Sequence, residues 1–148
     1  MRKHFTTVLV VAGLALSSMT MLAAKKPSLY NNLGGKKAIQ AVVDEFVGRV
    51  AADTRINAFF KRTASNPKQL ASFKAKLVDQ ICEAAGGPCK YTGKTMKAAH
   101  MGMGVGSADF GALVEDLVGA LDKFKVKEAD KNALLGVLGP MKSDIVEK

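Results

Sequence analysis

Apolar residues recur at three- and four-residue spacing along most of this chain, which is the period of an amphipathic helix. The clearest stripe predicts a helix over about residues 36–51, and Gly34-Gly35 marks a break before it. A short segment over residues 56–60 follows. The apolar positions of the first stripe are Ala38, Ile39, Val42, Val43, Phe46, Val47 and Val50.

A second long helix is marked at both ends. Ser65-Asn66-Pro67 is a helix-start pattern, because proline costs no hydrogen bond in a first turn. Gly86-Gly87-Pro88 predicts the end of this helix. After a loop we expect a short helix over residues 94–101, cut off by the glycines that follow it. The inward positions of the long helix are Leu70, Phe73, Leu77, Val78 and Ile81.

Two more stripes complete the chain. Ser107 or Asp109 is expected to cap one helix, and a last helix begins at about Lys127 and is kinked by Pro140. With 148 residues, 48% apolar and only 6% aromatic, the sequence predicts one all-α domain over residues 25–148. The apolar positions are Phe110, Leu113, Val114, Leu117, Val118 and Leu121, then Leu134, Leu135, Val137, Leu138, Met141 and Ile145.

Residues 1–24 have the pattern of an export signal. Arg2-Lys3-His4 is a basic start, residues 8–16 are apolar, and small residues precede a cut after Ala24. Leu22 departs from the A-x-A pattern, and the uncharged run is long enough to span a bilayer, so an uncleaved anchor is the alternative. Either way we expect an exported protein, periplasmic or secreted, that touches a membrane only if the signal is uncleaved.

Export bears on the two cysteines, Cys82 and Cys89. An oxidising compartment allows them to pair across the intervening turn, and this is the hypothesis we favour. The alternative is two free thiols, because helix-end geometry can hold the Cα atoms too far apart.

The formal net charge is +9, or +7 with 20 basic and 13 acidic residues once Arg2 and Lys3 are removed. The lysines are spread along the chain, with no arginine stripe and no interleaved aromatic residues. We therefore expect a solvated surface and no nucleic-acid partner.

His100 is the one histidine that remains after the signal segment. A lone histidine is commonly a surface or core-edge residue. Here Met96 precedes it by one turn, Met103 follows it, and glycines beyond it allow the backbone to approach a bulky group. A neutral imidazole in apolar surroundings is also the usual proximal ligand of haem iron.

A series of motifs around His100 resembles the group 1 truncated haemoglobins over residues 28–146. The resemblance implies a two-over-two helical sandwich that holds haem b. C-x-x-C-H is absent, so we expect non-covalent binding. The motifs are Leu29-Tyr30, Leu33-Gly34-Gly35, Ala38-Ile39, Val42-Val43-Asp44-Glu45-Phe46, Phe59-Phe60, Gly86-Gly87-Pro88, Tyr91-Thr92-Gly93-Lys94, Met96, and His100 in His-Met-Gly-Met-Gly-Val.

The resemblance implies roles for individual residues. His100 matches the proximal iron ligand, and Phe60 matches the ring that packs against the haem face. Phe46 matches a residue that packs on the distal side. The positions that line the haem in this family are matched by Tyr91, Met96 and Val105, and Lys94 matches a basic residue that meets a haem propionate.

The distal side departs from the family pattern. Val47 stands where oxygen-binding members place a tyrosine, Leu77 where many have glutamine, and Phe73 at the usual gate. The pocket therefore lacks the usual hydrogen-bond donors to bound oxygen, which predicts faster oxygen loss and easier oxidation of the iron. Lys76 is expected to be an exposed side chain near a propionate, with distal iron ligation as the alternative; Gln80 is a weaker candidate donor.

Several functions follow from these residues. We favour a monomeric haem protein that binds diatomic gases (oxygen, nitric oxide, carbon monoxide). One alternative is an enzyme, either a nitric oxide dioxygenase or a peroxidase-like scavenger. Another is a six-coordinate electron-transfer protein that has a redox partner and in which both His100 and Lys76 bind the iron. The last is a helical module without haem. The missing tyrosine argues against efficient dioxygenation, because the oxygen complex must persist long enough to react.

Overall fold

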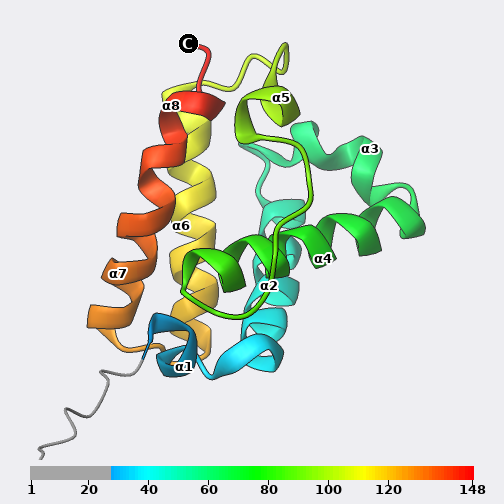
Figure 1. Cartoon of the computed structure of the whole chain (residues 1–148). Coiled ribbons are helices and arrows are strands. Elements are labelled where there is room, and N and C mark those ends of the chain that lie inside the picture. The colour runs from blue at the N-terminus through cyan, green and yellow to red at the C-terminus, as the bar shows by residue number, and fades with distance from the viewer. Residues whose placement is uncertain (1–27) are drawn as a thin grey trace, which may run out of the picture.

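The computed structural model describes residues 28–148, and the regular secondary structure of these residues is helical (Figure 1). The all-α prediction is confirmed for these residues, while the predicted signal segment lies outside them. None of the described helices combines the length and apolarity needed to cross a bilayer. The elements are α1 (Leu29–Asn32), α2 (Gly35–Ala52), the 3-10 turn η1 (Asn57–Phe60), α3 (Lys61–Ala64), α4 (Pro67–Ala84), α5 (Met96–His100), α6 (Ser107–Lys123), α7 (Glu128–Leu138), the 3-10 turn η2 (Gly139–Met141) and α8 (Lys142–Ile145).

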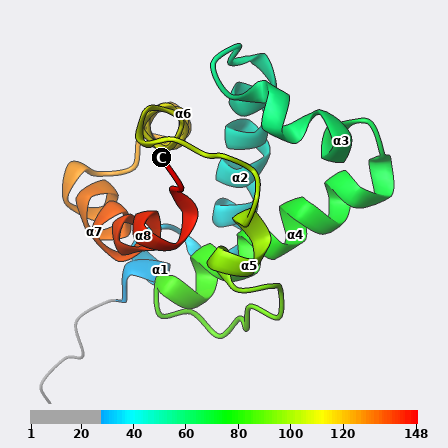
Figure 2. The ribbon, with the colours of Figure 1, turned by 90° about the horizontal axis from the view of Figure 1, so that it is seen from above.

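Two helix pairs make up the architecture. Helix α4 packs across α2, which also packs on α6, and α7 with α8 runs back antiparallel to α6 (Figures 1 and 2). The short α5 lies on α8, and α1 lies on α7. This is the two-over-two arrangement that the resemblance implies.

The apolar stripes meet in one core. Positions three and four residues apart on α2 are buried, and they pack against buried positions of α4, α6 and α7. Val43, Cys82 and Ala120 are fully enclosed. The buried set is Leu33, Ile39, Val42, Val43, Phe46, Val50, Ile56, Val78, Ile81, Cys82, Ala85, Ala112, Leu117, Ala120, Leu121 and Leu134.

The predicted start of α4 is confirmed. Pro67 is the first helical residue, and the Asn66 side chain accepts hydrogen bonds from the backbone N–H groups of Lys68 (3.0 Å) and Gln69 (3.2 Å). The break before α2 is confirmed too: Gly34 has a φ of +92°, in the left-handed region that favours glycine.

Two helix ends differ from the prediction. Neither Ser107 nor Asp109 is the N-cap of α6; Gly106 is, and the Asp109 carboxylate accepts the N–H of Gly106 (2.8 Å) from inside the first turn. The short helix α5 is narrower than residues 94–101, because the Thr95 hydroxyl accepts from Ala98 N–H and begins the helix there. Pro140 does interrupt the last helix, as a 3-10 turn between α7 and α8.

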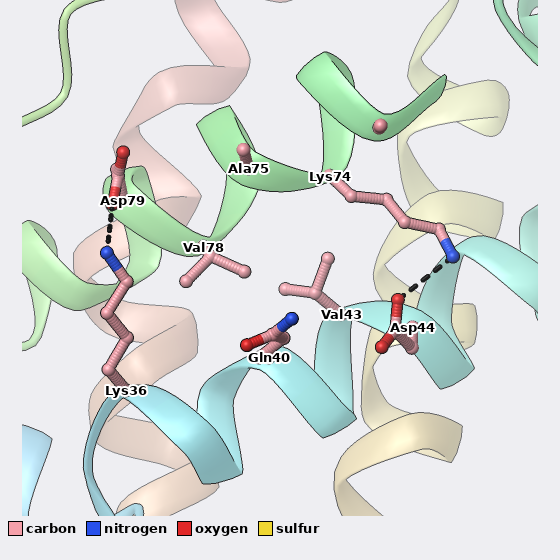
Figure 3. Close-up of a pocket in the computed structure, with 9 residues that line it drawn as sticks. Lys36, Gln40, Val43, Asp44, Lys74, Ala75, Val78 and Asp79 are labelled. Atoms are coloured by element: carbon pink, nitrogen blue, oxygen red, sulfur yellow. Dashed lines mark hydrogen bonds and ion pairs between the residues drawn. The ribbon is translucent and has the colours of Figure 1, made fainter. Parts of the chain in front are cut away.

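Ion pairs bridge α2 and α4 on either side of a hollow of about 310 Å³ (Figure 3). Lys36 pairs with Asp79 at 3.1 Å, and Lys74 pairs with Asp44 at 2.9 Å. These ion pairs span the crossing of the two helices on both sides of the hollow.

A disulfide joins the end of α4 to the loop after it. The sulfurs of Cys82 and Cys89 are bonded, and the Cα atoms lie 5.7 Å apart, within the range that a disulfide requires. The predicted pairing is therefore confirmed, and the alternative of two free thiols is wrong. Gly87 permits this closure, since a Cβ there would lie 2.8 Å from the Cys82 sulfur and 2.4 Å from the Tyr30 ring.

Candidate functional site

A cavity of about 660 Å³ lies among α2, α3, α4, α5, α6 and the α7–η2–α8 segment. Its wall is mostly apolar, and no Asp or Glu is among the described residues that line it. The volume falls in the range of sites for small organic ligands and cofactors, roughly 300–1,000 Å³. In Figure 2, α2, α4, α5 and α6 lie around the middle of the view, and α3 lies at its edge.

His100 is the one imidazole in the cavity wall and is half-buried at the end of α5. Its Nδ1 lies 2.7 Å from the carbonyl oxygen of Met96. Because a carbonyl can only accept, Nδ1 carries the proton and Nε2 keeps its lone pair. The imidazole is therefore fixed in the tautomer that can bind a metal through Nε2.

The backbone beyond His100 is held by the C-terminal tail. Glu147 accepts hydrogen bonds from the N–H groups of Gly102 (2.7 Å) and Gly104 (2.5 Å), which both have positive φ. These bonds lower the pKa of the Glu147 carboxyl. The Met103 N–H in turn donates to the carbonyl of His100 (3.0 Å), so the loop and the candidate ligand share one network.

Ten of the eleven residues proposed from the sequence to contact a cofactor line this cavity: Phe46, Val47, Phe60, Phe73, Lys76, Leu77, Tyr91, Lys94, Met96 and His100. Val105 does not. It is buried outside the cavity wall, and its carbonyl accepts the N–H of Glu147 (2.8 Å) in the C-terminal tail.

Few hydrogen-bond donors face the apolar part of the cavity. Val47 and Leu77 line it without polar atoms. The Gln80 amide nitrogen donates to the thioether sulfurs of Met96 (3.2 Å) and Met141 (3.4 Å), so it is already occupied. The rings of Phe60 and Phe73 lie 5.8 Å apart at a tilt of 51° and close one side.

Three lysines line the cavity where it opens to solvent: Lys61, Lys76 and Lys94. None forms an ion pair within the described residues. Beside them, the Tyr91 hydroxyl donates to the carbonyl of Lys94 (2.7 Å) and the Tyr91 N–H donates to Glu83 (2.9 Å), which fixes the loop that carries Lys94.

The α6, α7 and α8 side of the cavity was not predicted from the sequence. Those residues appear in the sequence only as apolar stripes, a signal that cannot separate core from cavity wall. They are Phe110, Leu113, Val114, Leu117, Leu135, Leu138, Met141 and Ile145.

This arrangement suits a large, flat, apolar ligand that carries a metal at its centre and anionic groups at its edge. The apolar walls could cover its faces, Nε2 of His100 would be available to the metal, and Lys61, Lys76 and Lys94 line the cavity as cations that could meet the anionic groups.

Comparisons with known proteins agree with this description. Residues 28–147 match the family model of the bacterial-like globins. The chain is 35% identical over 122 residues to the group 1 truncated hemoglobin GlbN of Mycolicibacterium paratuberculosis, covering 82% of this chain and 86% of that protein. It is 34% identical over 126 residues to the group 1 truncated hemoglobin of Tetrahymena pyriformis, covering 84% of this chain and 98% of the relative.

Solved structures are similar as well. The Fe(III) form of the Tetrahymena pyriformis truncated hemoglobin superposes with a TM-score of 0.75 at 32% identity, covering 82% of this chain and 100% of that one. The 2/2 hemoglobin of Synechococcus, described as having covalently attached heme, superposes with a TM-score of 0.74 at 30% identity and the same coverage.

Proposed function

Because this chain belongs to the bacterial-like globins and, among them, to the group 1 truncated hemoglobins, we propose that it binds haem b and diatomic gases, with His100 as the proximal iron ligand. The observation that carries this proposal is the position of His100. It is the sole imidazole of an apolar cavity, and the Met96 carbonyl fixes its tautomer.

The described residues favour non-covalent attachment. A covalent link to haem needs a free thiol or a further nucleophilic side chain such as a second imidazole. Both cysteines are joined in a disulfide, and His100 is the only histidine in residues 28–148. The apolar walls, together with Lys61 and Lys94 at the edge, supply the binding that a covalent link would otherwise provide.

A bound haem would supply an iron able to take a diatomic gas. Val47, Leu77 and Gln80 line the cavity and would offer that gas no hydrogen bond, because Val47 and Leu77 are apolar and the Gln80 amide donates to two thioethers. Oxygen depends more on a donor than carbon monoxide or nitric oxide does. We therefore propose a pocket that binds all three gases and retains oxygen weakly.

We further propose that the protein is exported. Support comes from the basic start, the apolar run and the small residues before position 25. Sequencing the amino terminus of protein recovered from outside the cytoplasm tests this; a start at Met1 in a cytoplasmic fraction contradicts it.

Titration of the purified protein with haemin tests the central proposal. We expect a 1:1 complex with a Soret band, and a shift of that band when the reduced complex is exposed to carbon monoxide. Folded protein that takes up no haemin overturns the proposal.

A further inference from the structure

Acidic residues are absent from two stretches of the described chain, residues 54–78 and 84–108. The two stretches carry nine basic residues between them. The rest of residues 28–148 carries nine basic residues and all thirteen acidic ones. The lysines are spread along the chain, but the carboxylates that would neutralise them are not.

Both stretches contribute lysines to the wall of the same cavity. Residues 54–78 form η1, α3 and most of α4, and residues 84–108 run from the last residue of α4 through the following loop and α5 to the first two residues of α6. Lys61 and Lys76 line the cavity from the first stretch, and Lys94 lines it from the second. In Figures 1 and 2, α3 and the start of α4 lie on the side of the molecule away from α7.

Six of the nine cations are exposed and form no ion pair within the described residues; we call them the cationic rim. The other three are neutralised: Arg55 pairs with Asp53 and Glu115, and Lys74 and Lys90 each pair with one carboxylate. The cationic rim consists of Lys61, Arg62, Lys68, Lys76, Lys94 and Lys97.

We propose that the cationic rim docks an acidic electron-donor protein at the cavity mouth. The inference rests on the proposed function, because a gas-binding haem must be kept ferrous. One electron passes from the donor's reduced cofactor to the ferric iron, so the donor is oxidised by one electron and the iron becomes ferrous. Two haem propionates neutralise only part of the rim, and the remaining positive potential accelerates encounter with an acidic surface.

A protein partner fits the surface better than an anionic membrane. Peripheral membrane binding combines cations with apolar side chains that insert between lipids. The large apolar side chains exposed on these two stretches are Met101 and Met103, which follow α5, and none lies among the cations of α3 and α4. Three of the six rim residues, Lys61, Lys76 and Lys94, line the cavity proposed to hold haem, so a partner bound to them would lie close to the cofactor.

Charge reversal at matched sites tests the proposal. The rim variant is Arg62→Glu/Lys97→Glu, whose side chains do not line the cavity, and the control is Lys37→Glu/Lys127→Glu, away from the rim. Within the described residues, none of the four side chains forms an ion pair.

The probe is a flavodoxin, an acidic flavoprotein. Calorimetry measures its affinity in the oxidised state, and stopped-flow absorbance measures reduction of the ferric haem protein by the reduced flavodoxin.

We expect the rim variant to lose at least tenfold in both affinity and reduction rate at low ionic strength, with the difference shrinking in about 0.5 M salt. The control should stay within twofold of wild type, and equal reduction potentials for the variants exclude a change in driving force. Equal losses in both variants overturn the proposal, as does rim-dependent binding to phosphatidylglycerol vesicles without binding to flavodoxin. Failure of the wild type to take up haemin would instead reject the proposed function. The two failures can be distinguished, because the calorimetric titration with flavodoxin can be carried out without haem.

Discussion

The Nδ1 atom of His100 donates to the carbonyl of Met96, one turn earlier on α5, at 2.7 Å. This bond leaves Nε2 as the nitrogen available to iron. We expect His100→Ala to abolish haem uptake or weaken it at least a hundredfold, measured by haemin titration, while circular dichroism shows an unchanged helical content. A normal Soret band in this variant would remove the assignment.

Val47 lines the cavity where a donor would stabilise bound oxygen. Iron-bound oxygen carries superoxide-like charge, and a hydrogen bond to a charged acceptor contributes about 1.5–3 kcal/mol, so Val47→Tyr should slow oxygen dissociation by roughly 10- to 100-fold. Stopped-flow displacement of oxygen by carbon monoxide measures the rate. Val47→Phe adds the ring without the hydroxyl, and an equal slowing in that control would refute the hydrogen-bond account.

Lys76 is exposed at the cavity mouth. We expect Lys76→Ala to leave the ferric and ferrous spectra unchanged and to speed haem loss a few-fold, because a cation near a propionate is lost. Lys74→Ala removes a neighbouring lysine that pairs with Asp44 and serves as the control. Conversion from a low-spin to a high-spin spectrum in Lys76→Ala would instead identify this lysine as a distal iron ligand.

The Cys82–Cys89 disulfide closes a short loop, with a sequence separation of 7. Opening so short a loop should cost about 2.5 kcal/mol in the chain-entropy model. We expect Cys82→Ala/Cys89→Ala to lower the free energy of unfolding by about this amount in urea denaturation. Wild type treated with dithiothreitol should show the same loss, and no change in either sample would mean that the bond adds no stability.

Asp116 on α6 has a buried carboxylate oxygen, Oδ2, with no hydrogen-bond partner. Burial, reinforced by the charge of Asp53, raises the pKa of the Asp116 carboxyl. The folded protein therefore holds this proton more tightly than the unfolded chain. That stabilisation is complete below the unfolded pKa of about 3.9 and is lost as pH rises through the raised folded pKa.

Asp116→Asn mimics the protonated carboxyl. We expect it to raise the free energy of unfolding at pH 7 and to have little effect near pH 3.5, as urea denaturation at the two values would show. Asp144→Asn removes an exposed carboxylate and should change neither. An equal effect of Asp116→Asn at both pH values would contradict the assignment of the raised pKa to this group.

Local signals in the sequence were sufficient for most helices. Two predictions were confirmed because helix periodicity and capping act over a few residues: the helix that carries the apolar stripe from Ala38 to Val50, and the helix start at Asn66-Pro67. The one-turn helices α1 and α3 were not predicted, since four residues are too few to show a period. The start of α6 was misplaced because the Asp109 carboxylate reaches back to the N–H of Gly106, which makes Gly106 the N-cap and Asp109 a residue of the first turn.

The sequence by itself determined the helical class, the resemblance to a family and the identity of the candidate ligand, because these depend on residue type and short spacing. The tertiary structure alone decided which side chains share the cavity. It brings Phe110, Leu135 and Ile145 to the wall, and it buries Val105 outside that wall. It also brings lysines from two acid-free stretches to one cavity wall, where their charges act together because electrostatic potential depends on distance in space and not on separation along the chain.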